Sequence, residues 1–257
     1  MTTVNASLVA SVRARTGVSM MECKKALDEA QGDEEKAIEI LRKKGAAAAA
    51  KKADREQSEG AVFSATGNGK AAIVTLNCET DFVARDDTFQ SVGNELATTL
   101  MTGGMDAAKA KAEEKIPALV QKLGENITLG EMSLSEAAVS GVYVHSNGKI
   151  GVVIGLSGGS EDLARDIAMH AAAMNPSYVS PDDVTPESVD KEKEIWREQL
   201  AQEGKPAEIM EKIMVGKEKK FREENALLTQ EFVKDPSKLI QDLLDGSRIE
   251  EYVRVSI

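Results

Sequence analysis

The chain has 257 residues, of which 42% are hydrophobic and 29% are charged, and its formal net charge is -11. This balance is typical of a globular protein with one sizeable core or two to three small ones, and it excludes a disordered chain. The acidic excess argues against direct nucleic-acid binding, which needs clustered lysine and arginine. No apolar run is long enough to span a membrane, and the N-terminus lacks the pattern of a signal peptide.

The two cysteines, Cys23 and Cys78, lie in different segments and do not form a Cys-x-x-Cys motif. We interpret them as ordinary thiols in a reducing compartment, and they imply neither a disulfide nor a metal site. The expected location is the cytoplasm.

The first fifty residues predict three short helices, the first over residues 7–15. Ser19 caps the second helix and Asp33 caps the third, which is expected to end at Gly45. Residues 1–54 are therefore predicted to form a three-helix bundle of the ubiquitin-associated type and, from Gly45 on, an alanine-rich tether that is itself helix-permissive. So small a unit suits docking.

Residues 55–139 and 140–184 predict two related α+β subdomains, each with two strands, a Gly-Lys turn between them and a following helix. When the turns are aligned, the first strand-to-helix connection is roughly five residues longer than the second. The shorter connection is a bland Ser-Gly-Gly-Ser at residues 157–160, whereas the longer one contains Thr-Asp-Phe-Val at residues 80–83. An insertion that the fold can do without is a candidate for function.

Residues 185–226 predict an inserted antiparallel hairpin of two long charged helices, a coiled coil. The first helix is expected to run to Gly204 and the second to begin at Pro206. Its seam is expected to include Trp196 and Ile209.

Residues 227–257 are expected to complete the second subdomain. They predict a helix capped by Asp235 and Pro236, then a strand over residues 249–255 that joins the second sheet. The predicted fold class is α+β, with a three-helix bundle, two repeated core subdomains and an inserted helical hairpin.

No group of side chains predicts catalysis. His145 and His170 are the only histidines, and both are expected to have structural or surface roles. No glycine-rich loop has the spacing of a phosphate-binding loop. We therefore expect no enzymatic activity, no cofactor and no metal site.

Two apolar features remain without a structural assignment. Met20 and Met21 are adjacent in a helix and point about 100° apart, so both can hardly be central in one small core. Either one is buried and the other partly exposed, or the pair is an adaptable contact patch for another protein, with Arg13 adding charge. Phe82 either folds into the core while Asp81 caps a turn, or is an exposed interface anchor on a loop tip.

Two stretches resemble the signatures of one known family, bacterial translation elongation factor Ts. They are residues 12–27, Val-Arg-Ala-Arg-Thr-Gly-Val-Ser-Met-Met-Glu-Cys-Lys-Lys-Ala-Leu, and residues 77–85, Asn-Cys-Glu-Thr-Asp-Phe-Val-Ala-Arg. Both occur in the family's order and at its separation, and the resemblance covers nearly the whole chain. Val12 and Thr75 are mild departures from the family's usual leucine and acid. Many members continue beyond the position of Ile257 into a C-terminal helical module, so contacts of that module are not expected here.

The resemblance implies a guanine-nucleotide exchange factor with no catalytic site of its own. Its implied partner is elongation factor Tu, GDP-bound or nucleotide-free, with a higher-order complex possible. The residues implied in partner contact are Arg13, Met20, Met21, Thr80, Asp81, Phe82 and Val83. The first three would contact a helix of the GTPase domain, and Asp81 and Phe82 would enter near its Mg²⁺ and phosphate site. An interaction scaffold without exchange activity is the alternative of a different class.

Overall fold

The computed structural model describes residues 4–202 and 206–257 of a mixed α/β chain. The chain divides into two compact units, which are described separately below. Unit 1 comprises residues 1–134, 144–151 and 255–257, and unit 2 comprises residues 135–143 and 152–254. The finer division into five segments stays a prediction. None of the helices in the described ranges is both long and apolar enough to cross a membrane.

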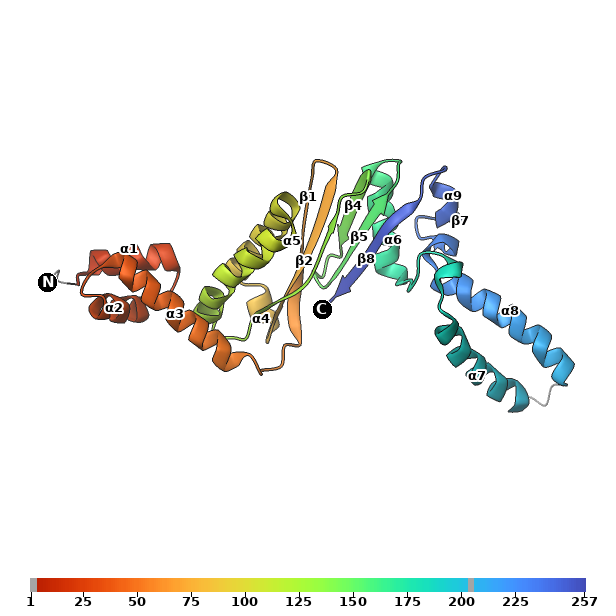
Figure 1. The fold of residues 1–257 in the computed structure, drawn as a ribbon, viewed down its shortest axis with the longest axis horizontal. Helices are drawn as coiled ribbons and strands as arrows, with labels where there is room; N and C mark the ends of the chain where they lie inside the picture. Colours follow the sequence, from red (N-terminus) through yellow and green to blue (C-terminus); the bar gives the residue numbers. More distant parts are fainter. Residues whose placement is uncertain (1–3, 203–205) are drawn as a thin grey trace. The chain divides into compact units, whose positions relative to one another are not determined.

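Unit 1 begins with three packed helices, α1 (Ala6–Thr16), α2 (Met20–Glu29) and α3 (Glu34–Lys52) (Figure 1). The side chains of Asn5, Ser19 and Asp33 cap them by accepting backbone N–H groups that would otherwise lack partners. Their buried faces form one apolar cluster: Val9, Val12, Val18, Cys23, Ala26, Leu27, Ala30, Ala37 and Leu41. The predicted helices and caps in this region are confirmed.

The expected end of the third helix at Gly45 is wrong, because α3 continues through the alanine run to Lys52. Gly45 is buried where α3 crosses α5, and a Cβ at this position would lie 3.0 Å from the carbonyl oxygen of Pro117. The glycine thus permits a close approach of two helices and does not end one. Beyond it, the ammonium of Lys52 donates to the carbonyl of Gly124. The predicted tether is therefore a helix packed against the core of unit 1.

The predicted hairpin after the bundle is confirmed as β1 (Glu59–Gly67) and β2 (Lys70–Cys78), which pair antiparallel with Gly67 opposite Lys70. Asn68 and Gly69 both have positive φ (53° and 75°), as the tight turn of a two-residue hairpin requires. The following elements are α4 (Asp81–Ala84), α5 (Asp87–Leu123) and β3 (Thr128–Ser135), and the sheet order is β1-β2-β3.

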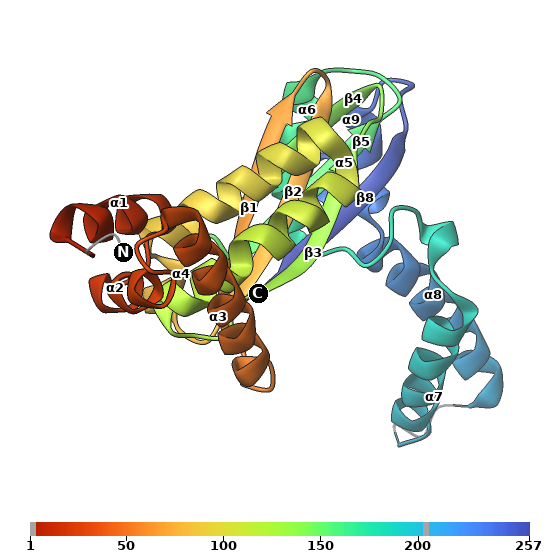
Figure 2. The ribbon, with the colours of Figure 1, turned by 60° about the vertical axis from the view of Figure 1, so that its left-hand side comes forward.

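Helix α5 is two helical limbs joined at Gly104, whose φ of 78° and ψ of -175° break the helix. The limbs lie side by side, linked by ion pairs from Lys111 and Lys115 to Glu95, and α5 covers β1 and β2 (Figure 2). Gly93 allows α5 to pack closely against β1, since a Cβ there would lie 2.2 Å from the ring of Phe63. The core between helix and sheet is built around buried aromatic and aliphatic side chains: Phe63, Val74, Leu76, Phe89, Leu96 and Leu100.

The second sheet has the order β4-β5-β8, formed by β4 (Val139–Val144), β5 (Ile150–Leu156) and β8 (Ile249–Ser256). The prediction that the last strand joins the second sheet is confirmed. After β5, unit 2 continues with α6 (Glu161–Met174) and the 3₁₀ turn η1 (Pro181–Asp183). The order strand, turn, strand, helix therefore occurs twice, as the repeated sequence pattern predicts.

Helices α7 (Pro186–Gln202) and α8 (Ala207–Asn225) pack side by side as a hairpin (Figure 1). The ring of Trp196 meets that of Phe221 edge-on, with centroids 5.8 Å apart. Ile209, expected in this seam, is instead half exposed, because α8 presents that part of its face to solvent. The predicted helix end at Gly204 lies outside the described residues.

The C-terminal part of unit 2 differs from its prediction in one element. It contains η2 (Leu227–Thr229), β6 (Glu231–Phe232), β7 (Asp235–Leu239) and α9 (Ile240–Leu243). The helix expected from Asp235 and Pro236 is therefore wrong over residues 235–239, which pair antiparallel with β6. Phe232 and Asp235 face each other across this short ribbon. Strand pairing satisfies the backbone of residues 235–239, and the predicted helix is limited to α9.

His170 on α6 is fully buried and ties this ribbon to the rest of unit 2. Its Nδ1 accepts the backbone N–H of Val233 at 3.3 Å, so its Nε2 carries the proton and donates to Oε1 of Gln230 at 3.0 Å. Burial lowers the pKa of His170, and the hydrogen bond with Gln230 opposes this only in part. A second proton would have to displace the Val233 bond, so the imidazole is structural and neutral.

We expect the free energy of unfolding of unit 2 to decrease as the pH falls from about 7 to about 5. The unfolded chain takes up a proton on His170 near its ordinary pKa, whereas the native state resists it. Stability from the neutral imidazole is therefore complete above that pKa and is lost below it. The variant His170→Gln should reduce this slope by up to about 1.4 kcal/mol per pH unit.

Urea unfolding followed by the fluorescence of Trp196, the only tryptophan in the chain, measures this slope in unit 2. The exposed His145 provides the control, and His145→Asn should keep the slope of the unmodified chain. An unchanged slope in His170→Gln would contradict the assignment.

Candidate functional site

The insertion between β2 and α5 folds as the short helix α4, capped by Thr80. The Thr80 hydroxyl accepts the backbone N–H of Val83 at 3.4 Å. Val83 is only 9% exposed and belongs to the core of unit 1, whereas the neighbouring Phe82 is 83% exposed. The helix therefore uses Val83 as an anchor and presents the phenyl ring of Phe82 to solvent. The interpretation in which Phe82 folds into the core is therefore wrong, and its role as an interface anchor stays a prediction.

Asp81 opens α4, and its carboxylate pairs with Arg85 at 3.1 Å. Both side chains reach solvent, with 43% of the Asp81 side chain and 80% of the Arg85 side chain exposed. Exposed pairs of this kind contribute about 0–1 kcal/mol. The carboxylate can therefore leave Arg85 for another donor at little cost.

Cys78, at the end of β2, lies under this turn. Its thiol is buried and donates to the carbonyl of Thr80 at 3.2 Å. Burial raises the pKa of the Cys78 thiol to about 12, and the Glu125 carboxylate adds to the effect. The thiol is therefore protonated and unreactive, and it helps to hold the Thr80 backbone.

Unit 2 has no helix in the corresponding connection. Between β5 and α6, Gly159 turns the chain at a φ of 100°, and the hydroxyl of Ser160 caps α6 by accepting the N–H of Leu163 at 3.2 Å. The shorter link makes the same strand-to-helix reversal without an exposed aromatic. Helix α4 is therefore an addition to the repeated fold.

The second candidate surface lies on the three-helix bundle, where Met20 is 50% and Met21 is 67% exposed. Neither is a core residue, so the interpretation in which one of the pair is buried is wrong. Met20 and the exposed Arg13 line one shallow groove, and Met20 and Met21 line a neighbouring one. The structure thus brings these three predicted residues together.

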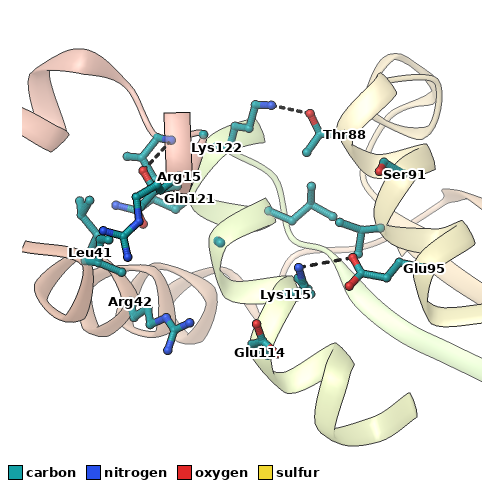
Figure 3. Close-up of a pocket in the computed structure, with 17 residues that line it drawn as sticks. Arg15, Leu41, Arg42, Thr88, Ser91, Glu95, Glu114, Lys115, Gln121 and Lys122 are labelled. Atoms are coloured by element: carbon teal, nitrogen blue, oxygen red, sulfur yellow. Dashed lines mark hydrogen bonds and ion pairs between the residues drawn. The ribbon is translucent and has the colours of Figure 1, made fainter. Parts of the chain in front are cut away.

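A further pocket of about 330 Å³ lies between the bundle and α5 (Figure 3). Three of its four basic side chains have partners within unit 1: Arg15 pairs with Glu35, Lys115 pairs with Glu95, and Lys122 donates to the Thr88 hydroxyl. Charges paired in this way favour a junction between helices over an anion-binding site. Lys122 also lines the groove of Arg13 and Met20, so the junction adjoins the methionine surface.

Comparison with known proteins identifies the family to which the chain is similar. Residues 79–257 match the model of a family described as elongation factor TS. The chain is 47% identical over 265 residues to an elongation factor Ts of Hahella chejuensis, covering 100% of this chain and 93% of the relative. It is 48% identical to that of Marinobacter nauticus, with 100% and 92% covered, and 44% identical to that of Thioalkalivibrio sulfidiphilus, with 99% and 92% covered.

The chain belongs to the elongation factor Ts family. The resemblance carried by the two sequence stretches is therefore confirmed. The family match begins at Glu79 and so includes all of α4, while the full-length identities extend over the bundle with Arg13, Met20 and Met21.

The structure also shows which of the predicted site residues on α4 face solvent and which face the core, a distinction that the sequence alone could not make. Asp81 and Phe82 lie at the surface of α4, whereas Thr80 and Val83 hold it from within. One residue in contact with this turn was missed entirely. Glu125 lies 45 positions from Thr80 in the chain, and no local sequence pattern marks it.

Proposed function

We propose that this chain is a guanine-nucleotide exchange factor for elongation factor Tu and acts in the cytoplasm during translation elongation. It would bind the GDP-bound GTPase and promote release of GDP by disturbing the Mg²⁺ and phosphate site, after which GTP rebinds. No catalytic group of the chain takes part. Membership in the elongation factor Ts family supports this role.

The observation that carries the proposal is the exposure of Phe82 on a helix that is otherwise well anchored. A phenylalanine that is 83% exposed contributes little to the folded chain, but it can gain about 1.5–3 kcal/mol when a partner buries it. Since α4 is already formed, little further ordering is needed when the ring is inserted. Phe82 is suited to act as a wedge.

The free energy needed to accelerate GDP release is similar to that gained when a few apolar side chains such as Phe82 are buried at an interface. Acceleration of GDP release by ~10⁴-fold requires the barrier to fall by roughly 5.5 kcal/mol. This must come from contacts that are better made when the nucleotide site is distorted. By linkage, whatever factor the exchange factor takes off the equilibrium affinity for nucleotide, bound nucleotide must take off the affinity for the exchange factor.

Asp81 is proposed to assist the wedge. Its carboxylate can exchange Arg85 for polar groups of the GTPase, including those that would otherwise order the metal site. Thr80 and Val83 contribute by fixing the helix on which both residues lie.

The methionine surface is proposed as the second attachment point. Met20 and Met21 supply flexible apolar contact area and Arg13 supplies charge, and together they would contact a helix of the GTPase domain. The bundle would then serve as a docking module of the ubiquitin-associated type, and the α7–α8 hairpin as a coiled-coil arm.

Stopped-flow release of a fluorescent GDP analogue from elongation factor Tu, with and without this chain, tests the function. We expect the release rate to rise with the concentration of the chain and to reach a plateau. Binding without any change in the release rate would instead favour an interaction scaffold.

A further inference from the structure

The turn that precedes α4 is held by a carboxylate from a distant part of the chain. Glu125 lies between α5 and β3, and its Oε2 accepts the backbone N–H groups of Glu79 and Thr80, each at 3.0 Å. Its Oε1 accepts the Thr80 hydroxyl at 2.6 Å. Two consecutive residues thus donate three hydrogen bonds to one carboxylate, which fixes both the position and the orientation of the turn.

The turn at residues 79–80 also accepts a hydrogen bond from the segment of Glu125. The Glu79 carboxylate accepts the backbone N–H of Asn126 at 2.6 Å and contacts Arg55 at 3.4 Å. The bond from Asn126 lowers the pKa of Glu79, and the charge of Arg55 lowers it further. Asn126 is buried, and its amide donates to the carbonyls of Ala53 and Arg55. The turn therefore has a rigid support.

Thr80 transmits this support to α4. Its hydroxyl donates to Glu125 and also accepts the N–H of Val83, so one oxygen joins the carboxylate to the first turn of the helix. A helix of four residues is unstable by itself, and its direction depends on what holds its ends. The side chain of Phe82 is exposed, so the support acts on its backbone and leaves its ring free.

We propose that Glu125 is a positioning residue for nucleotide exchange, which fixes the orientation of α4 so that Phe82 enters the partner at one angle. This rests on the proposed function. Without the carboxylate, α4 would still reach the partner but in several orientations. The Phe82 ring would then seldom take the position that distorts the Mg²⁺ and phosphate site of the GTPase. Glu125 should therefore affect the maximal rate of GDP release more than the concentration at which that rate is half reached.

The test measures GDP release from elongation factor Tu against the concentration of Glu125→Ala and Glu125→Gln. We expect Glu125→Ala to lower the plateau rate roughly tenfold, less than the roughly hundredfold loss that a misplacement of about 1 Å can cause at a catalytic site, with the half-saturating concentration changed less than about twofold. Glu125→Gln keeps one acceptor oxygen and should lie between. Glu56→Gln, at an exposed glutamate of the same unit, should behave like the unmodified chain.

A double-mutant cycle with Phe82→Ala separates positioning from general support of the fold. If Glu125 acts through the Phe82 ring, its replacement should cost almost nothing further once the ring is gone. Thr80→Ser keeps the hydroxyl and should be active, whereas Thr80→Val should lose activity as Glu125→Ala does. The threonine pair tests the same link even if Glu125→Ala fails to fold.

A normal plateau rate in folded Glu125→Gln and Thr80→Val, or losses that add fully in the double mutant, would overturn the positioning role. No acceleration by the unmodified chain would instead overturn the proposed function. Loss of activity in Phe82→Ala with full activity in every Glu125 variant would leave the function standing and reject only the role of Glu125.

Discussion

Phe82→Ala is expected to lower the plateau rate of GDP release from elongation factor Tu by roughly a hundredfold, which corresponds to about 2.7 kcal/mol. The ring is exposed in the free chain, and its removal leaves no cavity there. The stability of the chain should therefore change by less than about 0.5 kcal/mol. A loss of rate without a loss of stability would identify Phe82 as a group that acts only in the complex.

Stopped-flow release and thermal unfolding of the same samples provide the two measurements. Phe82→Leu keeps much of the apolar volume and should retain part of the rate. Met105→Ala, which shortens another exposed apolar side chain of unit 1, is the matched control and should release GDP normally. A folded Phe82→Ala variant that accelerates GDP release as well as the unmodified chain would contradict the proposed role of Phe82 as a wedge.

The double variant Met20→Ala/Met21→Ala is expected to raise the half-saturating concentration for exchange by roughly a hundredfold, or about 2.7 kcal/mol. Full burial of a methionine contributes about 1.5–3 kcal/mol, but both side chains are already partly buried in the free chain and each alanine keeps its Cβ. The plateau rate should change little, since this surface provides attachment and does not touch the wedge. The stability should also be preserved, because neither side chain lies in the bundle core.

Isothermal titration with nucleotide-free elongation factor Tu would measure the loss of affinity directly. Met105→Ala again serves as the control, now with the same residue type. An unchanged dissociation constant would show that the methionine surface binds something else. A lower plateau rate with unchanged affinity would also contradict the separation of attachment from wedge.

Local sequence signals predicted much of the fold because they depend on short-range physics. The Asn68-Gly69 turn, the caps at Ser19 and Asp33, and the strands on either side of the turn each follow from the conformations that a few adjacent residues favour. The repeat was visible for the same reason. Its extra connection pointed to Phe82 before any contact was known.

The errors arise where distant residues decide. Gly45 looks like a helix end, yet α3 continues because its backbone packs against Pro117, which is 72 positions later in the chain. Residues 235–239 look like a helix start, but pairing with β6 makes them a strand. Ile209 fits a helical seam by its spacing, but the packing of α7 and α8 leaves it half exposed.

Residues 80–83 show both what local sequence determines and what distant contacts determine. The amino-acid sequence alone determined that an acid and a phenylalanine occupy a connection that needs neither, and it was enough to identify the family. Only the tertiary structure decided that Val83 faces the core, that Phe82 faces solvent, and that Glu125 holds the turn. The reason is physical: local preference selects the helix, but the direction in which it presents a side chain depends on contacts from residues far away in the chain.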